Sequence, residues 1–309
     1  MSRGFRHKIA FVVPTLNRPL ELRRMLRSVV GQAVLPHEVV IVDGSATPVE
    51  NLASEFPQIA LKYVPVYPPS LSKQRNAGIA ALSPDATLAG YLDDDLVLED
   101  GCIEAMLRFW ESAPGDVGGA AFNIVNERSP RGIFVKSLFY VDGFRRGAVL
   151  RSGYQSMIGP VRRDIEVDWL SGGVTVWRRQ VTQAFEYDEW FKGTGYLEDV
   201  DFSYRVSRKY RLFVLADARV QHLSPPVKRS RDYLMGKWQA INRMYFVRKH
   251  PEFSRPLYYW ATFGLFLANI AEGIATFNHG LLLRAAGNIV GLAKVSSGRL
   301  DQLSGYLKQ

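Results

Sequence analysis

The sequence predicts an α/β fold in which a mostly parallel sheet is flanked by helices. Short, unbroken apolar runs alternate with helical patterns over the first third of the chain. Runs of this kind are typical of strands that are buried on both faces, and their alternation with helices indicates a parallel sheet. Several of the runs end abruptly in polar residues. Ligands of open α/β sheets bind at the carboxyl ends of the strands, so these polar residues are the first candidates for a site.

Four strands and two helices make up this alternation. The expected strands are Ile9–Val13, Val39–Val42, Leu61–Val66 and Leu88–Leu92, and the expected helices are Pro19–Gln32 and Ser72–Leu82. The first helix places Leu22, Met25 and Val29 on one side, as the helical period requires. In this topology Asn17, Asp43 and the acidic residues after Leu92 gather along one edge of the sheet.

The second half of the chain is less regular. Further strands are expected at Gly118–Val125 and Arg211–Ala216, and a helix is expected to begin near Glu198. Between them, Val167–Trp177 carries Trp169 and a glycine pair, which lets backbone or ligand approach closely. Arg128–Arg163 is basic and contains glycine, so we expect a loop over the cleft. We predict a catalytic domain over residues 1–225 and a helical extension over residues 226–309.

The extension contains an aromatic, uncharged run from Pro256 to Ala271, and a second apolar run follows Glu272 as far as Leu283. Neither run alone reaches the ~20 residues that are needed to span a bilayer. One interpretation is a helix pair lying at a membrane surface. The other is a helical extension packed on the catalytic domain or on a partner chain, with oligomers formed through the C-terminal helices. The sequence leaves both open.

Charge and cysteine content limit the kinds of partner and the cellular compartment that we expect for this protein. The chain has 309 residues, a net charge of +9 and a single cysteine, Cys102, which excludes an intramolecular disulfide framework and suits a reducing compartment. Met1–Lys8 leads into only a brief apolar stretch, which is not typical of a secretory signal. We therefore expect a cytoplasmic protein, peripheral on the inner face of the membrane if the first interpretation of the extension holds. The positive charge suits phosphorylated substrates or anionic membranes, and no nucleic-acid partner is expected because RNA-recognition and zinc-finger patterns are missing.

Three consecutive carboxylates, Asp93, Asp94 and Asp95, follow the strand Leu88–Leu92 directly. Residues two apart project from the same side of an extended chain, so Asp93 and Asp95 can converge on one divalent cation. Oxygen ligands suit Mg²⁺ or Mn²⁺, and Mg²⁺ usually shares its shell with substrate phosphates. The alternative is a solvated acidic turn before Leu96–Trp110, with Asp94 or Asp95 capping a helix.

An ordered set of motifs resembles the family 2 glycosyltransferases, which have a glycosyltransferase A-type fold. The set comprises Val12-Val13-Pro14-Thr15-Leu16-Asn17-Arg18, Val42-Asp43-Gly44-Ser45, Gln74-Arg75-Asn76-Ala77-Gly78, Asp93-Asp94-Asp95, Gly172-Gly173, Glu198-Asp199-Val200-Asp201 and His222. It spans Ile9 to His222, and the chain after Pro226 lies outside it.

The resemblance implies roles for individual residues. Donor binding falls to Pro14, Thr15, Asn17, Asp43, Arg75, Asp93 and Asp94, with Asp43 against the base and Arg75 near the nucleotide or its diphosphate. Asp95 and His222 are expected to hold the metal, and Asp199 to act as the catalytic base. We assign Trp169, Gly172, Gly173 and Glu198 to the acceptor side.

The expected reaction moves a sugar from a nucleotide-sugar donor to a hydroxyl of a saccharide or lipid-linked acceptor, with inversion. Charge that builds on the leaving diphosphate needs a cation, Mn²⁺ or Mg²⁺, and Arg75. The acceptor hydroxyl must lose its proton to a carboxylate on the opposite face of the sugar, and Asp199 is suitable. Repulsion from Glu198 would raise the proton affinity of Asp199. We expect a role in the synthesis of cell-surface polysaccharide or glycolipid.

Two other functions compete with this one. A nucleotidyltransferase acting on sugar phosphates would usually carry a glycine-rich, lysine-containing phosphate loop, and Pro14–Pro19 has none. A non-enzymatic, basic membrane-binding adaptor leaves the acidic triplet and Glu198-Asp199 unexplained. Structural roles also stay open for single residues. Glu198, Asp199 and Asp201 could cap a helix, His222 could be a surface or core residue, and Trp169 could be a core residue.

Overall fold

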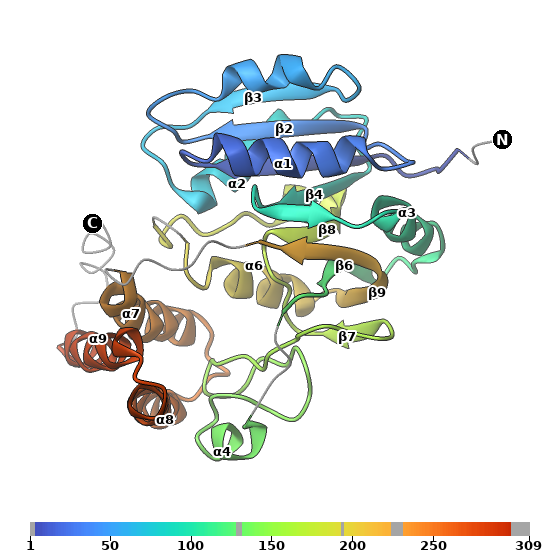
Figure 1. Cartoon of the computed structure of the whole chain (residues 1–309). Coiled ribbons are helices and arrows are strands. Elements are labelled where there is room, and N and C mark those ends of the chain that lie inside the picture. Colours follow the sequence, from blue (N-terminus) through green and yellow to red (C-terminus); the bar gives the residue numbers. More distant parts are fainter. Residues whose placement is uncertain (1–3, 128–131, 193–194, 224–230, 298–309) are drawn as a thin grey trace. The chain divides into compact units, whose positions relative to one another are not determined.

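The computed structural model describes residues 4–127, 132–192, 195–223 and 231–297, and the chain divides into two compact units (Figure 1). The first, called the sheet unit below, comprises Met1–Ser129, Gly159–Glu189 and Gly193–Ser224. The second, called the helical unit, comprises Pro130–Ile158, Trp190–Lys192 and Pro225–Gln309. The domain division at residue 225 stays a prediction.

The sheet unit is built on one nine-stranded sheet with the order β3-β2-β1-β4-β8-β6-β9-β5, in which β7 also pairs with β9. The strands are β1 (Ile9–Thr15), β2 (Glu38–Asp43), β3 (Leu61–Pro65), β4 (Leu88–Leu92), β5 (Leu96–Leu98), β6 (Val117–Ile124), β7 (Ile165–Val167), β8 (Val174–Arg178) and β9 (Arg211–His222). The helices of this unit are α1 (Pro19–Val30), η1 (Glu50–Glu55), α2 (Leu71–Ala81), α3 (Cys102–Ser112), α5 (Arg179–Ala184) and α6 (Glu198–Ser207).

The N-terminal half of the sheet is parallel, as the unbroken apolar runs predict. Strand β1 pairs in parallel with β2 and β4, and β2 pairs in parallel with β3. Every residue of β1, β2 and β4 is buried, which is why these strands do not alternate apolar and polar residues. Helix α1 buries Leu22, Met25 and Val29, the side expected from its period.

The direction of pairing changes beyond β4. Strand β8 is antiparallel to β4, with Leu92 opposite Val174. The residues that precede β8 therefore lie opposite those that follow β4. This places Gly173 beside Asp93, whose backbone N–H donates to the Gly173 carbonyl at 2.9 Å.

The segment after the acidic triplet does not lead directly into a helix, as the alternative of a helix-capping turn requires. Residues Leu96–Leu98 form β5 and pair with β9, with Leu96 opposite His222. Helix α3 begins only at Cys102, after Gly101 in a left-handed conformation with φ of 75°. This pairing carries β9 on to His222, beyond the expected end at Ala216, and brings His222 next to the acidic triplet.

The helical unit contains α4 (Ile133–Leu138), α7 (Asp232–Lys249), α8 (Arg255–Ala275) and α9 (His279–Ser296). Its core includes Ile241, Met244, Val247, Tyr258 and Val295. Helices α7 and α9 approach closely, because a Cβ on Gly287 would lie 2.2 Å from the Tyr233 carbonyl. The predicted C-terminal helical extension is confirmed. Among the described residues, no helix has the length and apolar character to traverse a bilayer.

The basic segment expected as a loop over the cleft is more structured than predicted. Residues 128–131 lie outside the described part of the chain. The rest contributes α4 and a series of turns, and residues 130–158 belong to the helical unit. The helix Ile133–Leu138 has only six residues, so it is too short to show a helical period in the sequence.

Candidate active site

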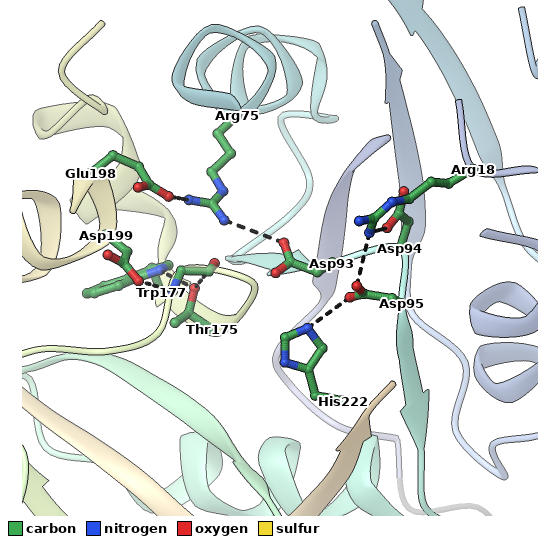
Figure 2. Close-up of polar contacts among 11 residues, drawn as sticks. Arg18, Arg75, Asp93, Asp94, Asp95, Thr175, Trp177, Glu198, Asp199 and His222 are labelled. Atoms are coloured by element: carbon green, nitrogen blue, oxygen red, sulfur yellow. Dashed lines mark hydrogen bonds and ion pairs between the residues drawn. The ribbon is translucent and has the colours of Figure 1, made fainter. Parts of the chain in front are cut away.

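Three side chains at the end of β4 and β9 form a group that can hold a metal ion (Figure 2). One ligand atom each from Asp93, Asp95 and His222 lies within 4.8 Å of the other two. The Nε2 of His222 is 2.9 Å from Oδ1 of Asp95. Two carboxylates and one imidazole suit Mn²⁺, and carboxylates also suit Mg²⁺. The donor set therefore fits the cation expected from the sequence.

Arg18 supplies positive charge to this acidic cluster (Figure 2). Its Nη1 donates to Oδ1 of Asp94 and to Oδ2 of Asp95, both at 3.0 Å. Thr15 Oγ1 donates to the other oxygen of Asp94 at 2.7 Å. Sequence reasoning did not single out Arg18, although it closes the motif that contains Thr15 and Asn17. The contact makes Arg18 the internal counterion of two adjacent carboxylates.

The surroundings shift the proton affinities of this cluster in different directions. Burial raises the pKa of Asp94 to about 6, although Thr15 and Arg18 oppose the shift. Burial also acts on Asp95, but His222 and Arg18 outweigh it and hold the pKa of that carboxyl below its ordinary value. The hydrogen bond with Asp95 raises the pKa of His222.

Asp43, at the end of β2, is buried and already well bonded. Its carboxylate accepts hydrogen bonds from the backbone N–H groups of Ser45 and Val49 and from the Tyr63 hydroxyl, at 2.8–2.9 Å. Ser45 Oγ in turn accepts from the N–H of Asn17 at 2.7 Å. Asp43 thus holds the loop after β2 in place. Its role toward a nucleotide base stays a prediction.

A cavity of about 350 Å³ lies beside this loop and is lined by Asn17, Pro19, Arg23, Thr47, Pro48, Val49, Asn51, Leu52 and Glu55.

The amide of Gln74 on α2 donates to the carbonyls of Thr15 and Val42, both at 2.9 Å. It ties the carboxyl ends of β1 and β2 together. The polar residues after these strands therefore stand on a rigid edge.

Arg75 lies at the centre of the second half of the site and is buried, with 2% relative exposure. Its Nη1 donates to Glu198 Oε1 at 2.6 Å, and its Nη2 is 3.5 Å from Asp93 Oδ1 (Figure 2). The guanidinium also lies over the rings of Tyr187 and Tyr91, at 4.9 and 5.8 Å from the centroids. The Nε atom has no hydrogen-bond partner among the described residues. Arg75 therefore connects the metal group to the start of α6.

Helix α6 begins with the acidic pair. Asp199 accepts from the N–H of Gly172 at 3.2 Å and from that of Val200 at 2.8 Å. Burial raises the pKa of Glu198 to about 8, with added repulsion from Asp199 and an opposing attraction to Arg75. Burial likewise raises the pKa of Asp199. A carboxylate with increased proton affinity is suited to accept a proton from a hydroxyl.

The glycine pair before β8 is required sterically. A Cβ on Gly173 would lie 1.9 Å from the Asp93 carboxylate, and one on Gly172 would lie 2.6 Å from Arg75 Nη1 and 2.9 Å from Asp199 Cβ. Only glycine lets the backbone approach these three side chains so closely. The pair thus shapes the site, and its assignment to acceptor binding stays a prediction.

Asp201 and Trp169 are buried, as is typical of residues with a structural role. Asp201 is completely buried and accepts from Arg205 Nε at 2.9 Å, one helical turn further along α6. Trp169 is 9% exposed and counts among the buried core residues of the sheet unit. The acceptor-stacking role assigned to Trp169 stays a prediction.

Comparison with known proteins identifies the family. Residues 7–241 match the family model described as "Glycosyltransferase like family 2", which is about three quarters of the chain. The chain therefore belongs to this family, and the expectation of a glycosyltransferase is confirmed at the level of the family. A 112-residue segment is 30% identical to the uncharacterized glycosyltransferase YwdF of Bacillus subtilis (strain 168) and covers 34% of this chain. The match spans only 39% of YwdF.

Solved structures share the fold. A mannosyltransferase from Pyrobaculum calidifontis, PcManGT, in complex with GDP-Man and Mn²⁺, has a TM-score of 0.58 at 14% identity, covering 94% of this chain and 91% of its own. GalNAc-T7 with UDP, GalNAc and Mn²⁺ has a TM-score of 0.55 at 16% identity, covering 87% of this chain and 58% of its own. The glycosyltransferase A-type fold expected from the sequence is confirmed.

Proposed function

We propose that this protein is a metal-dependent, inverting glycosyltransferase that moves a sugar from a nucleotide-sugar donor to an acceptor hydroxyl. The observation that carries the proposal is the joining of two acidic groups by one buried arginine. Asp93, Asp95 and His222 form the metal-type group, Glu198 and Asp199 form the base-type pair, and Arg75 contacts both groups. The family and the two Mn²⁺-containing neighbours agree with this chemistry.

The metal-type group faces the donor in this proposal. Asp93, Asp95 and His222 would hold Mn²⁺ or Mg²⁺. Such an ion, when bound, supplies positive charge for the leaving diphosphate. Thr15, Asn17 and the loop held by Asp43 would form the nucleotide pocket, together with Pro14 and the second carboxylate, Asp94. A rigid set of strand ends reduces the entropy that is lost when the donor binds.

Asp199 serves as base in this proposal. Its pKa is raised by burial, and the N–H groups of Gly172 and Val200 fix its side chain. A positioned base with raised proton affinity removes the hydroxyl proton as the acceptor attacks, and a single displacement of this kind inverts the anomeric centre. Glu198, engaged by Arg75, positions the start of α6. Trp169, Gly172 and Gly173 would line the acceptor side of the site.

The acceptor belongs to the saccharides or lipid-linked saccharides in this proposal, with a role in polysaccharide or glycolipid synthesis on the cytoplasmic side of the membrane. The support is the basic charge of the chain, which suits a phosphorylated carrier.

The test is turnover of a panel of nucleotide-sugars, including GDP-mannose and UDP-sugars, with Mn²⁺, with Mg²⁺ and with EDTA. We expect release of nucleoside diphosphate that depends on the metal and on Asp95. Turnover that is unaffected by EDTA would contradict the metal requirement. Release of pyrophosphate from a nucleoside triphosphate and a sugar phosphate would instead indicate a nucleotidyltransferase. NMR of the product anomer separates inversion from retention.

A further inference from the structure

The charge of this chain is divided very unequally between its two units. The helical unit holds 18 Lys and Arg against 5 Asp and Glu, a net charge of +13, whereas the sheet unit holds 21 against 25, a net charge of −4. The unit that carries the acidic active-site residues is therefore not the source of the basic character of the protein. The excess positive charge is a property of the helical unit alone.

The helical unit also exposes a group of large apolar side chains. We call this group the apolar face; it comprises Phe134, Val135 and Leu138 on α4 and Trp260, Phe263 and Leu267 on α8. Phe134 is 70% exposed, Trp260 46% and Phe263 43%. The three members on α8, Trp260, Phe263 and Leu267, follow the helical period and so lie on one side of that helix. Exposed large apolar residues are ordinary when scattered, but six on two contacting elements call for an explanation.

Contacts between the end of α4 and α8 bring the two halves of the apolar face to one part of the helical unit. The indole N–H of Trp260 donates to the Leu138 carbonyl at 2.9 Å. Phe139 stacks on the Trp260 ring with centroids 4.9 Å apart. Gly264 leaves room for this packing, since a Cβ there would lie 2.3 Å from the Phe139 ring. The short helix α4 is thereby attached to the aromatic side of α8.

The two helices that carry the apolar face hold only one acidic residue, Glu272. Helix α4 carries one charged residue, Lys136, and α8 has none between Arg255, at its start, and Glu272, near its end. An apolar and aromatic surface bordered by basic residues is typical of proteins that lie at the interface of an anionic bilayer. Tryptophan in particular favours the headgroup region.

We propose that the apolar face of α4 and α8 is a docking surface for an anionic membrane, held there by the positive charge of the helical unit. The inference does not depend on the reaction proposed for the sheet unit. A second copy of this chain is the less favourable occupant, because it would bring another unit with a net charge of +13 against the first. A bilayer rich in phosphatidylglycerol supplies both the apolar interior and the opposite charge.

Brominated lipids provide a direct test with the full chain. All six tryptophans lie in the described part of the chain, and of these only Trp260 is exposed. Vesicles of phosphatidylglycerol and phosphatidylcholine with brominated acyl chains should quench the fluorescence of the parent protein. Trp260→Phe should abolish most of this quenching while leaving sedimentation with the vesicles largely intact. Absence of quenching in the parent, under conditions where it sediments with the vesicles, would overturn the proposal.

Substitution tests the affinity. Phe263→Ser combined with Leu267→Ser should lower vesicle binding by about tenfold or more, because two large apolar side chains no longer leave water. The matched control is Leu20→Ser with Tyr67→Ser in the sheet unit, where the parent side chains are 72% and 84% exposed. The control should bind like the parent. Circular dichroism and the melting temperature establish that both variants are folded. If the α8 variant fails to fold, Phe134→Ser with Val135→Ser on α4 replaces it.

Charge dependence completes the test. Binding should be strong for vesicles with phosphatidylglycerol, weak for phosphatidylcholine alone, and should fall as NaCl is raised. Equal binding to both lipids, or unchanged binding of the apolar-face variants, would overturn the proposal. A parent dimer that becomes monomeric in these variants, without vesicle binding by either form, would assign the face to a second copy.

Discussion

The guanidinium of Arg75 is 2.6 Å from the Glu198 carboxylate through Nη1 and 3.5 Å from Asp93 through Nη2. These two acids stand at the ends of elements that are more than a hundred residues apart in the chain. One buried cation therefore pairs with two acids. One stands at the end of the strand that carries the metal-type group, and the other at the start of the helix that carries the base-type pair. Burying a charge is costly unless it is paired, so the three side chains stabilise one another as a set.

The first prediction tests this set. Arg75→Met should lower the free energy of unfolding by up to about 3–5 kcal/mol, because it leaves the buried Glu198 carboxylate without its partner. Adding Glu198→Gln removes this carboxylate, so the double variant should be more stable than Arg75→Met alone. Urea denaturation of both single variants, the double variant and the parent measures the coupling. Additive losses would contradict a direct interaction between residues 75 and 198. Sugar transfer should be lost in every variant that lacks Arg75.

The second prediction concerns the metal-type group. Asp95→Ala should abolish Mn²⁺-dependent donor binding, since it removes one of the three side chains of the metal-type group. The fold should survive, because Arg18 keeps its bond to Asp94. Isothermal titration with Mn²⁺ and donor measures the effect, and Asp85→Ala, at an exposed acid elsewhere in the sheet unit, is the control. Full Mn²⁺-dependent turnover by Asp95→Ala would remove Asp95 from the metal site.

The third prediction separates binding from chemistry. Asp199→Asn keeps the shape of the side chain but cannot accept a proton at neutral pH. It should bind donor and metal nearly as the parent does, while transfer falls by roughly 10²–10⁴-fold. Asp201→Asn, two positions further along α6, should mainly reduce stability, because Asp201 is buried against Arg205. Single-turnover kinetics and donor titration distinguish the two. If both variants lose transfer to the same extent, Asp199 and Asp201 share a structural role. Near-normal transfer by Asp199→Asn would assign the role of base to Glu198.

The fourth prediction is a pH dependence of stability. The pKa of Glu198 is raised from the ordinary 4.5 to about 8, first by burial and then by Asp199. A carboxyl group with a raised pKa in the folded state stabilises the fold below its unfolded pKa, and this contribution is lost as the pH rises through the folded pKa. The free energy of unfolding should therefore fall between about pH 4.5 and pH 8. In Glu198→Gln this fall should be shallower, whereas Glu104→Gln, at a partly exposed site on α3, should follow the parent. Urea denaturation across this range gives the answer, and parallel curves for all three proteins would refute the shift.

The transfer rate should depend on pH in the opposite direction. A base acts only when it is deprotonated, and burial raises the pKa of Asp199. We therefore expect the rate to decline on acidification at a higher pH than an ordinary carboxylate would give. The pH profile of single-turnover transfer, recorded for the parent enzyme, measures this directly.

Sequence patterns alone predict the parallel half of the sheet and the edge at which the site lies. Unbroken apolar runs such as Leu88–Leu92 reveal strands buried on both faces, and the polar residue after each run lies at the carboxyl edge whatever the details of packing. For this reason the order of residues along the chain is sufficient to place Asp43 and the acidic triplet along one edge.

Which of these side chains touch depends on the three-dimensional arrangement of the whole chain. His222 reaches Asp95 because Leu96 pairs with it across β5 and β9, and a three-residue strand is too short to reveal itself by periodicity. Arg18 and Arg75 are visible in the sequence as charges, but their partners Asp94 and Glu198 lie 76 and 123 positions away. Local patterns record whether a residue is buried. Contacts over such separations follow from strand register and helix packing, to which distant parts of the chain contribute together.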